Sequence, residues 1–202
     1  MMKGKTYITL FNIKYSIFLF AILSCTQITA QIQLNNPSFE DTPSDATTPM
    51  GWFECEEHTT PDIMPGYWGV YNEASEGETF VGMITRENGT YESIGQRLSK
   101  TMKEGICYRF SLDLAHSDSY SGYNESLKLR VWIADKKCGE QQLVFESPLI
   151  DEIEWQNFKI EFSPEKDAKY IMIEAFFKEG RFKRKGNILI DNVSPIRVCS
   201  RV

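Results

Sequence analysis

The feature that most constrains the fold is a series of short segments in which apolar and polar residues alternate. Alternation with a period of two is typical of β-strands that bury one face. It is clearest in residues 106–114, which read ICYRFSLDL. Six segments carry a strand pattern: 91–98, 106–114, 127–133, 155–162, 170–177 and 188–193. Because almost no helical period lies between them, the sequence predicts an all-β antiparallel sandwich rather than alternating strands and helices.

The first 30 residues have the order of a secretory signal peptide. Three lysines and no acidic residue accompany an apolar run at 17–23, which is too short for the roughly 20 apolar residues that a membrane span needs. Two processing sites compete: cleavage after Ala30, and a sequence resembling a lipobox in which Cys25 would be lipidated. We favour cleavage after Ala30. It predicts an exported mature chain, residues 31–202, without a transmembrane segment.

The predicted mature chain is one acidic domain. Its 172 residues suit a single sandwich, and no repeat or second domain is evident. Loss of the leader removes three positive charges and no negative ones, so the formal net charge changes from −6 to −9. Nucleic acids and anionic lipid surfaces are therefore excluded as expected partners.

Four cysteines stay in the predicted mature chain: Cys55, Cys107, Cys138 and Cys199. An even number in an exported protein predicts at least one disulfide, and three pairings remain open. Buried free thiols are the alternative, because cysteine packs well as a small apolar residue.

No motif for catalysis is present. The two histidines, His58 and His116, lie in no HExxH pattern, and no serine lies in GxSxG. A pair of carboxylates could hydrolyse a glycosidic bond, but with 28 acidic residues some pair is always available. The expectation is a protein that is not an enzyme.

The two ends of the predicted domain carry a more specific pattern. Residues 35–40 (NNPSFE), the pair at 51–52 (GW) and residues 188–193 (ILIDNV) resemble the jelly-roll modules of the galactose-binding-like superfamily, which includes carbohydrate-binding modules of secreted bacterial glycoside hydrolases. The resemblance implies that the first strand, at 36–40, lies beside the last. It also implies a structural Ca²⁺ held by Glu40 and Asp191, whose carboxylate oxygens suit a hard cation. The alternative is that both are acids at strand ends on the surface.

The middle of the chain extends the resemblance. It is similar to a sandwich module of exported Bacteroidetes proteins, and the likeness covers nearly all of residues 34–196. The matching segments are 60–63, 77–82, 91–98, 108–115 and 145–150. This resemblance implies the fold more strongly than any ligand, because binding sites are grafted onto folds.

Two aromatic segments interrupt the strand pattern, at 67–72 and 116–124. Sugar rings stack on aromatic side chains while nearby polar groups bind the hydroxyls, so exposed rings beside polar residues indicate glycan binding. The predicted ligand site consists of three ring platforms, Trp68, Tyr120 and Tyr123, and three polar neighbours, Arg86, Asp118 and Asn124. Trp52, Trp132 and Trp155 lie in or near strands and are assigned to the core.

Three function classes follow from these observations. The first is an exported, non-catalytic module that binds a glycan or cell-surface polysaccharide. The second is a structural or adhesive surface protein that engages another protein. The third is a small enzyme acting on glycans.

Overall fold

The computed structural model describes residues 31–177 and 184–200. The predicted signal peptide and its cleavage site lie outside these residues. Within them there is no helix of a length and hydropathy that would cross a membrane.

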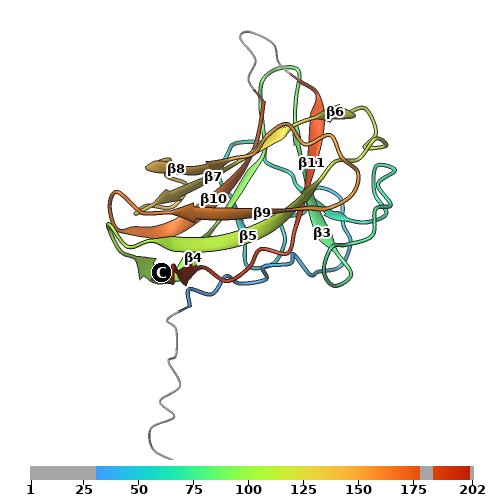
Figure 1. The fold of residues 1–202 in the computed structure, drawn as a ribbon. Helices are drawn as coiled ribbons and strands as arrows, with labels where there is room; N and C mark the ends of the chain where they lie inside the picture. Colours follow the sequence, from blue (N-terminus) through green and yellow to red (C-terminus); the bar gives the residue numbers. More distant parts are fainter. Residues whose placement is uncertain (1–30, 178–183, 201–202) are drawn as a thin grey trace, which may run out of the picture.

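Twelve strands form two sheets (Figure 1). The five-stranded sheet has the order β1-β4-β10-β7-β8. The seven-stranded sheet has the order β12-β5-β11-β3-β2, with β6 beside β11 and β9 beside β5. The strands are β1 (Phe53–Glu54), β2 (Asp62–Met64), β3 (Phe80–Thr85), β4 (Ser93–Met102), β5 (Tyr108–Ala115), β6 (Glu125–Ser126), β7 (Lys128–Ala134), β8 (Gln142–Glu146), β9 (Gln156–Phe162), β10 (Ala168–Phe176), β11 (Gly186–Asp191) and β12 (Arg197–Val198).

The predicted antiparallel sandwich is confirmed. All strand pairs are antiparallel except the short pair of β6 and β11. Each of the six predicted segments corresponds to one strand: β4, β5, β7, β9, β10 and β11. Figure 1 shows β5 and β9 side by side in one layer, with β7, β8 and β10 in the other.

The main core lies between the two sheets, and the alternation of β5 explains how it forms. Tyr108, Phe110, Leu112 and Leu114 point inward and are buried, whereas Arg109 points outward and is exposed. Burying apolar surface at about 25 cal/mol per Å² is the main stabilising term in such a core.

Strand β3 was not among the predicted strands because it has no alternation. All six of its residues are buried. Val81 and Met83 belong to the core between the sheets, whereas Phe80 and Ile84 belong to a second apolar cluster on the outer face of the seven-stranded sheet. A strand covered on both faces reads as a continuous apolar run, which periodicity alone cannot assign.

The two ends of the domain lie side by side, as the resemblance implied. Ile32 and Ile196 form an antiparallel bridge, and the Val193 N–H donates to the Pro37 carbonyl at 3.0 Å. The expected first strand at 36–40 is wrong, however, because this segment is a turn. Asn36 has a φ of 46° and its side chain bonds the backbone N–H and carbonyl of Glu40, a local arrangement that competes with a strand.

Two disulfides close the fold, which confirms the prediction and rules out the alternative of free thiols. Cys55, just after β1, is bonded to Cys138 in the turn after β7. Cys107, just before β5, is bonded to Cys199, just after β12. Each sheet thus has one disulfide, and such bonds persist in oxidising compartments.

Candidate functional site

Two loops cover part of the outer face of the seven-stranded sheet. They belong to residues 66–74 and 116–124, and they are joined by hydrogen bonds from the Ser121 N–H to the Trp68 carbonyl and from the Ser119 hydroxyl to the Gly69 carbonyl, both 2.8 Å. Beneath them lies the second apolar cluster, which consists of Met64, Val70, Phe80, Ile84, Ala115, Tyr120 and Leu189. This cluster gives the loops a rigid base.

A pocket of about 230 Å³ opens at the edge of these loops. It brings together four of the six predicted ligand residues with residues from the segments leading to and forming β2. The lining residues are Asp45, Ala46, Thr60, Asp62, Trp68, Ile84, Arg86, Tyr120 and Tyr123. We call this the Trp68 pocket.

Trp68 presents a partly exposed ring to the pocket. Its residue exposure is 46%, and its indole N–H donates to the Asp45 carboxylate at 2.9 Å. The backbone of Trp68 has a φ of 54°, an uncommon conformation for a large residue. The hydrogen bond of its carbonyl with Ser121 helps to hold this turn.

The expectation that Tyr120 is an exposed platform is wrong. Its side chain is 1% exposed and packs in the second apolar cluster, and its hydroxyl donates to the Asp62 carboxylate. Burial raises the pKa of Tyr120 well above its ordinary value. Tyr123 is half-buried with its ring edge-on to Tyr120, and the Lys185 Nζ lies 4.9 Å from the Tyr123 ring centre.

Two buried carboxylates support the floor of the pocket. Burial raises the pKa of Asp62 to about 6, and its oxygens accept from the Tyr120 hydroxyl and the Ala46 N–H. Burial also raises the pKa of Glu92, which accepts from Thr60, from the Ile84 N–H and from Arg86 at 2.6 Å. Both oxygens of each carboxylate accept hydrogen bonds from the protein, so these acids position the surrounding loops.

Arg86 has the one guanidinium nitrogen in the described chain that is buried without a hydrogen-bond partner. Its Nη2 is bonded to Glu92 and Thr60, whereas its Nη1 is buried and unpaired. Buried polar atoms in folded proteins almost always have a partner. An enclosed water molecule is the partner that a buried nitrogen of this kind requires.

Asp118 and Asn124 do not join this pocket. Both are exposed, and neither is among its lining residues. The Asp118 carboxylate lies 3.6 Å from His116 Nε2. The two residues share the loop of Tyr120 and Tyr123, but the turn directs them to other parts of the surface.

A second aromatic surface, missed by the sequence reasoning, lies on the outer face of the five-stranded sheet. Trp132 is only partly buried, and its indole N–H donates to Glu174 at 2.8 Å. Burial raises the pKa of Glu174 to about 7. The signal was present, because Trp132 is in phase with the polar Lys128 and Arg130 and not with the buried Leu129. The Trp132 indole N–H and the Glu174 carboxylate are hydrogen-bonded to each other, whereas the Arg86 Nη1 has no partner.

The other two tryptophans are in core positions. Trp52 is 7% exposed and packs on Phe39 with ring centres 5.1 Å apart. Trp155 is half-buried against Phe80, and its indole N–H donates to the Glu73 carbonyl.

The two residues predicted to bind calcium face one loop, residues 75–79. Asp191 is fully buried and accepts from the N–H groups of Ser75 and Glu76 at 2.8 and 2.9 Å. Burial raises its pKa to about 6. Glu40 accepts from the N–H groups of Glu78 and Thr79. The alternative that both are surface acids is therefore wrong for Asp191.

In the described structure the Glu40 and Asp191 carboxylates clamp the loop 75–79. The groups directed at their oxygens are N–H donors, whereas Ca²⁺ takes 6–8 oxygen ligands. Among the residues that the structure describes, no third acid, histidine or cysteine completes a metal-ligating cluster with them.

The fold has counterparts among solved structures. A cyclase from Fischerella sp. TAU is 14% identical, with a TM-score of 0.56 over 85% of this chain and 98% of the cyclase. The CBM22-1 xylan-binding domain of Paenibacillus barcinonensis Xyn10C is 16% identical, with a TM-score of 0.52 over 85% of this chain and 96% of that domain. The K2 cleaved adhesin domain of Lys-gingipain is 13% identical, with a TM-score of 0.52 over 82% and 97%.

These similarities define the fold. The chain is a jelly-roll β-sandwich, a fold that it shares with the cyclase, the xylan-binding domain and the adhesin domain, which confirms the predicted fold class. Identities this low show the fold alone, since one fold hosts many functions. No protein-family model and no curated protein sequence matches the chain.

Proposed function

We propose that the protein is an exported carbohydrate-binding module that holds one sugar residue of a glycan in the Trp68 pocket. The observation that carries this proposal is the partly exposed Trp68 ring in the same pocket as the Arg86 side chain, which is 22% exposed. A sugar offers an apolar CH face for the ring and hydroxyl oxygens for the guanidinium. One sugar residue can therefore contact both the Trp68 ring and the Arg86 guanidinium.

The size of the pocket supports a single sugar residue. Its volume of about 230 Å³ is below the ~300–1,000 Å³ typical of pockets for drug-sized ligands. Tyr67 and Tyr71 belong to the same loop as Trp68 and are 39% and 76% exposed. Neither of them lines the pocket.

A binding role is favoured over catalysis by the state of the acids. Asp62 lines the pocket, and its two oxygens accept hydrogen bonds from the Ala46 N–H and the Tyr120 hydroxyl, which supports a role in positioning the loops. The two disulfides support export to an oxidising compartment. The fold shared with an adhesin domain makes adhesion to another protein the second candidate, and the exposed Tyr71 favours it.

The test compares two ring deletions in the same loop. The purified domain is screened against a panel of polysaccharides, and the affinity for the best ligand is measured by calorimetry. Trp68→Ala should weaken binding by about 5- to 150-fold, as expected for removal of a ring worth about 1–3 kcal/mol. Tyr71→Ala is the matched control, because Tyr71 does not line the pocket and its loss should have less effect.

Three outcomes would contradict the proposal. They are no binding to any glycan, an unchanged affinity in Trp68→Ala, and an equal loss in both variants. Binding that survives Trp68→Ala but is lost when Trp132 is replaced would move the site to the five-stranded sheet. Capture of a specific surface protein with no glycan affinity would favour the adhesive role.

The structural calcium is a separate proposal that rests on the resemblance. To bind Ca²⁺ between Glu40 and Asp191, the loop 75–79 must turn its N–H groups away and present oxygens. If it does, calcium at a hundredfold excess over Kd should stabilise the protein by about 2.7 kcal/mol, and Glu40→Ala should abolish this effect. If melting curves with calcium and with chelator coincide while Glu40→Ala still lowers Tm, the acids act as a clamp without a metal.

A further inference from the structure

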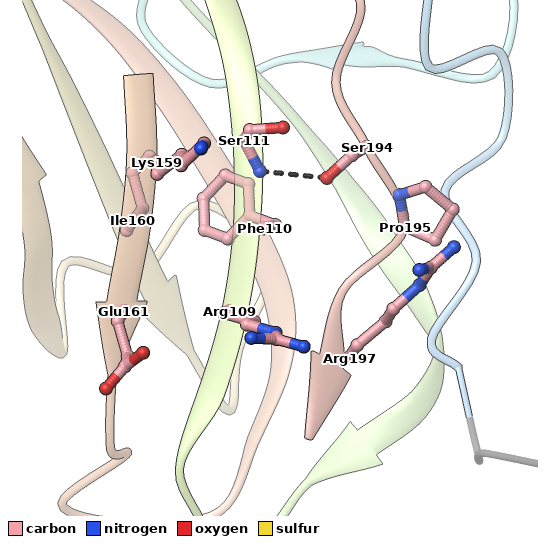
Figure 2. Close-up of a pocket in the computed structure, with 9 residues that line it drawn as sticks. All are labelled: Arg109, Phe110, Ser111, Lys159, Ile160, Glu161, Ser194, Pro195 and Arg197. Atoms are coloured by element: carbon pink, nitrogen blue, oxygen red, sulfur yellow. Dashed lines mark hydrogen bonds between the residues drawn. The ribbon is translucent and has the colours of Figure 1, made fainter. Parts of the chain in front are cut away.

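A second pocket lies on the outer face of the seven-stranded sheet, at the edge away from β2. It has a volume of about 480 Å³ and is formed by β5, β9 and the segment that leads into β12 (Figure 2). Three cationic side chains, Arg109, Lys159 and Arg197, line it together with Ser111 and Ser194. We call it the basic pocket.

The three cations are brought together by strand register. Arg197 on β12 lies directly opposite Arg109 on β5, and Lys159 on β9 lies opposite Ser111 on the other side of β5. Like charges directly opposite each other on neighbouring strands are destabilising. A chain with a net charge of −6 nevertheless concentrates three positive charges around one hollow, which is the arrangement that an anionic ligand would stabilise.

The nearest acid does not neutralise these charges. Glu161 lies opposite Arg109 in the register, but its carboxylate is within 4.8 Å of the Cys107 and Cys199 sulfurs. Figure 2 shows this carboxylate directed away from Arg109 and Lys159. Across residues 31–177 and 184–200, none of the three cations forms an ion pair.

The partners of the two arginines are neutral. Arg109 Nη2 donates to the Ser200 hydroxyl at 3.2 Å. Arg197 Nε and Nη2 lie 2.7 and 2.9 Å from the side-chain amide of Gln31, and they donate to its oxygen when that amide is turned to face them. Each guanidinium has five N–H donors, so both arginines are oriented and still have donors for a ligand.

We propose that the basic pocket binds the carboxylate or sulfate groups of an acidic polysaccharide. Guanidinium groups bind such anions through paired, charge-assisted hydrogen bonds. Ring stacking does not contribute, since Phe110, the aromatic residue in the lining, is only 4% exposed. The overall negative charge opposes every polyanion, nucleic acids and anionic membranes included, so binding of an acidic polysaccharide depends on the local group of three cations. This site is distinct from the Trp68 pocket and goes beyond the function proposed for it.

The experiment measures binding to polygalacturonate, dextran sulfate and neutral dextran by affinity electrophoresis. An acidic polymer should bind, neutral dextran should not, and added salt should weaken the complex. Polygalacturonate alone would identify a carboxylate ligand, and dextran sulfate alone a sulfate ligand. Lys159→Gln and Arg197→Gln should each weaken binding about tenfold or more, since each removes hydrogen bonds from a charged group. Lys100→Gln, an exposed cation on the five-stranded sheet, is the matched control.

The variants Trp68→Ala and Lys159→Gln distinguish binding in the Trp68 pocket from binding in the basic pocket. Trp68→Ala should leave the acidic polymer bound. If Trp68→Ala abolishes that binding while Lys159→Gln does not, the polymer occupies the Trp68 pocket and the basic pocket has no such role. The proposal is also overturned if neither acidic polymer binds, if Lys100→Gln has an equal effect, or if DNA or phosphatidylglycerol vesicles bind as tightly.

Discussion

Replacement of Tyr120 by alanine should destabilise the whole domain. The side chain is 1% exposed in the second apolar cluster, and its ring lies so close to Gly82 that a Cβ there would be 2.9 Å from it. Truncation of a buried aromatic residue to alanine costs about 3–5 kcal/mol. This is a large share of the 5–15 kcal/mol that stabilises a typical domain.

Two further variants separate the contributions. Tyr120→Phe keeps the ring and removes only the hydroxyl, which leaves an Asp62 oxygen without its donor and should cost about 1–3 kcal/mol. Trp68→Ala removes a half-exposed ring with one exposed hydrogen bond and should cost at most about 1 kcal/mol. The order of destabilisation should be Tyr120→Ala, then Tyr120→Phe, then Trp68→Ala.

The assay is urea denaturation followed by far-UV circular dichroism, because fluorescence would change with the loss of a tryptophan. A lower midpoint at a constant slope reports a change in stability. If Tyr120→Ala lost less than about 1 kcal/mol, the ring would not be part of the core. The loop 116–124 would then be open in solution, and Tyr120 would again be a candidate platform.

Two other predictions concern stability. Removal of the Cys107–Cys199 disulfide by a double alanine replacement should cost about 4 kcal/mol, because the bond closes a separation of 92 residues; an unchanged urea midpoint would contradict this. Burial raises the pKa of Asp62 from 3.8 to about 6 and that of Glu174 from 4.5 to about 7, so the folded state retains protons that the unfolded state releases. Their stabilising contribution, roughly 3 kcal/mol per carboxyl, is complete below pH 4 and is lost as the pH rises through 6–7. Urea unfolding at pH 4.5 and at pH 8 measures this contribution as a difference in the free energy of unfolding. Glu174→Gln should reduce that difference. Greater stability at pH 8 than at pH 4.5 would refute the reasoning.

The strands could be predicted where one face of the strand is buried and the other face is exposed to solvent. In β5 the inward Phe110 and the outward Arg109 record the two environments directly in the sequence. Alternation did not predict β3, because loops cover the outer face of this strand and both of its faces are therefore apolar. The alternation in β7 does place Trp132 on the same face as the polar Arg130, which indicates that its side chain points outward.

The sequence predicted only part of the candidate site, because the covering of a side chain depends on residues that are distant in the sequence. The sequence located the aromatic loops, and the structure brings Trp68, Arg86 and Tyr123 to one pocket. It could not show that Tyr120 turns inward, because that depends on the apolar outer face of β3 and β11, which is distant in sequence. The basic pocket was invisible for the same reason, since Arg109 and Arg197 meet only through strand pairing.

By itself, the sequence determined that this chain is an antiparallel β-sandwich with disulfides, because alternation and cysteine number are local or additive properties of a chain. Tertiary structure alone decided which cysteines pair, which aromatic rings are covered and where cations gather. These depend on contacts between residues far apart in the sequence, such as Cys55 with Cys138, which are separated by 83 positions. Pairing at that distance is set by the register and packing of whole sheets, and no short segment of the chain contains that information.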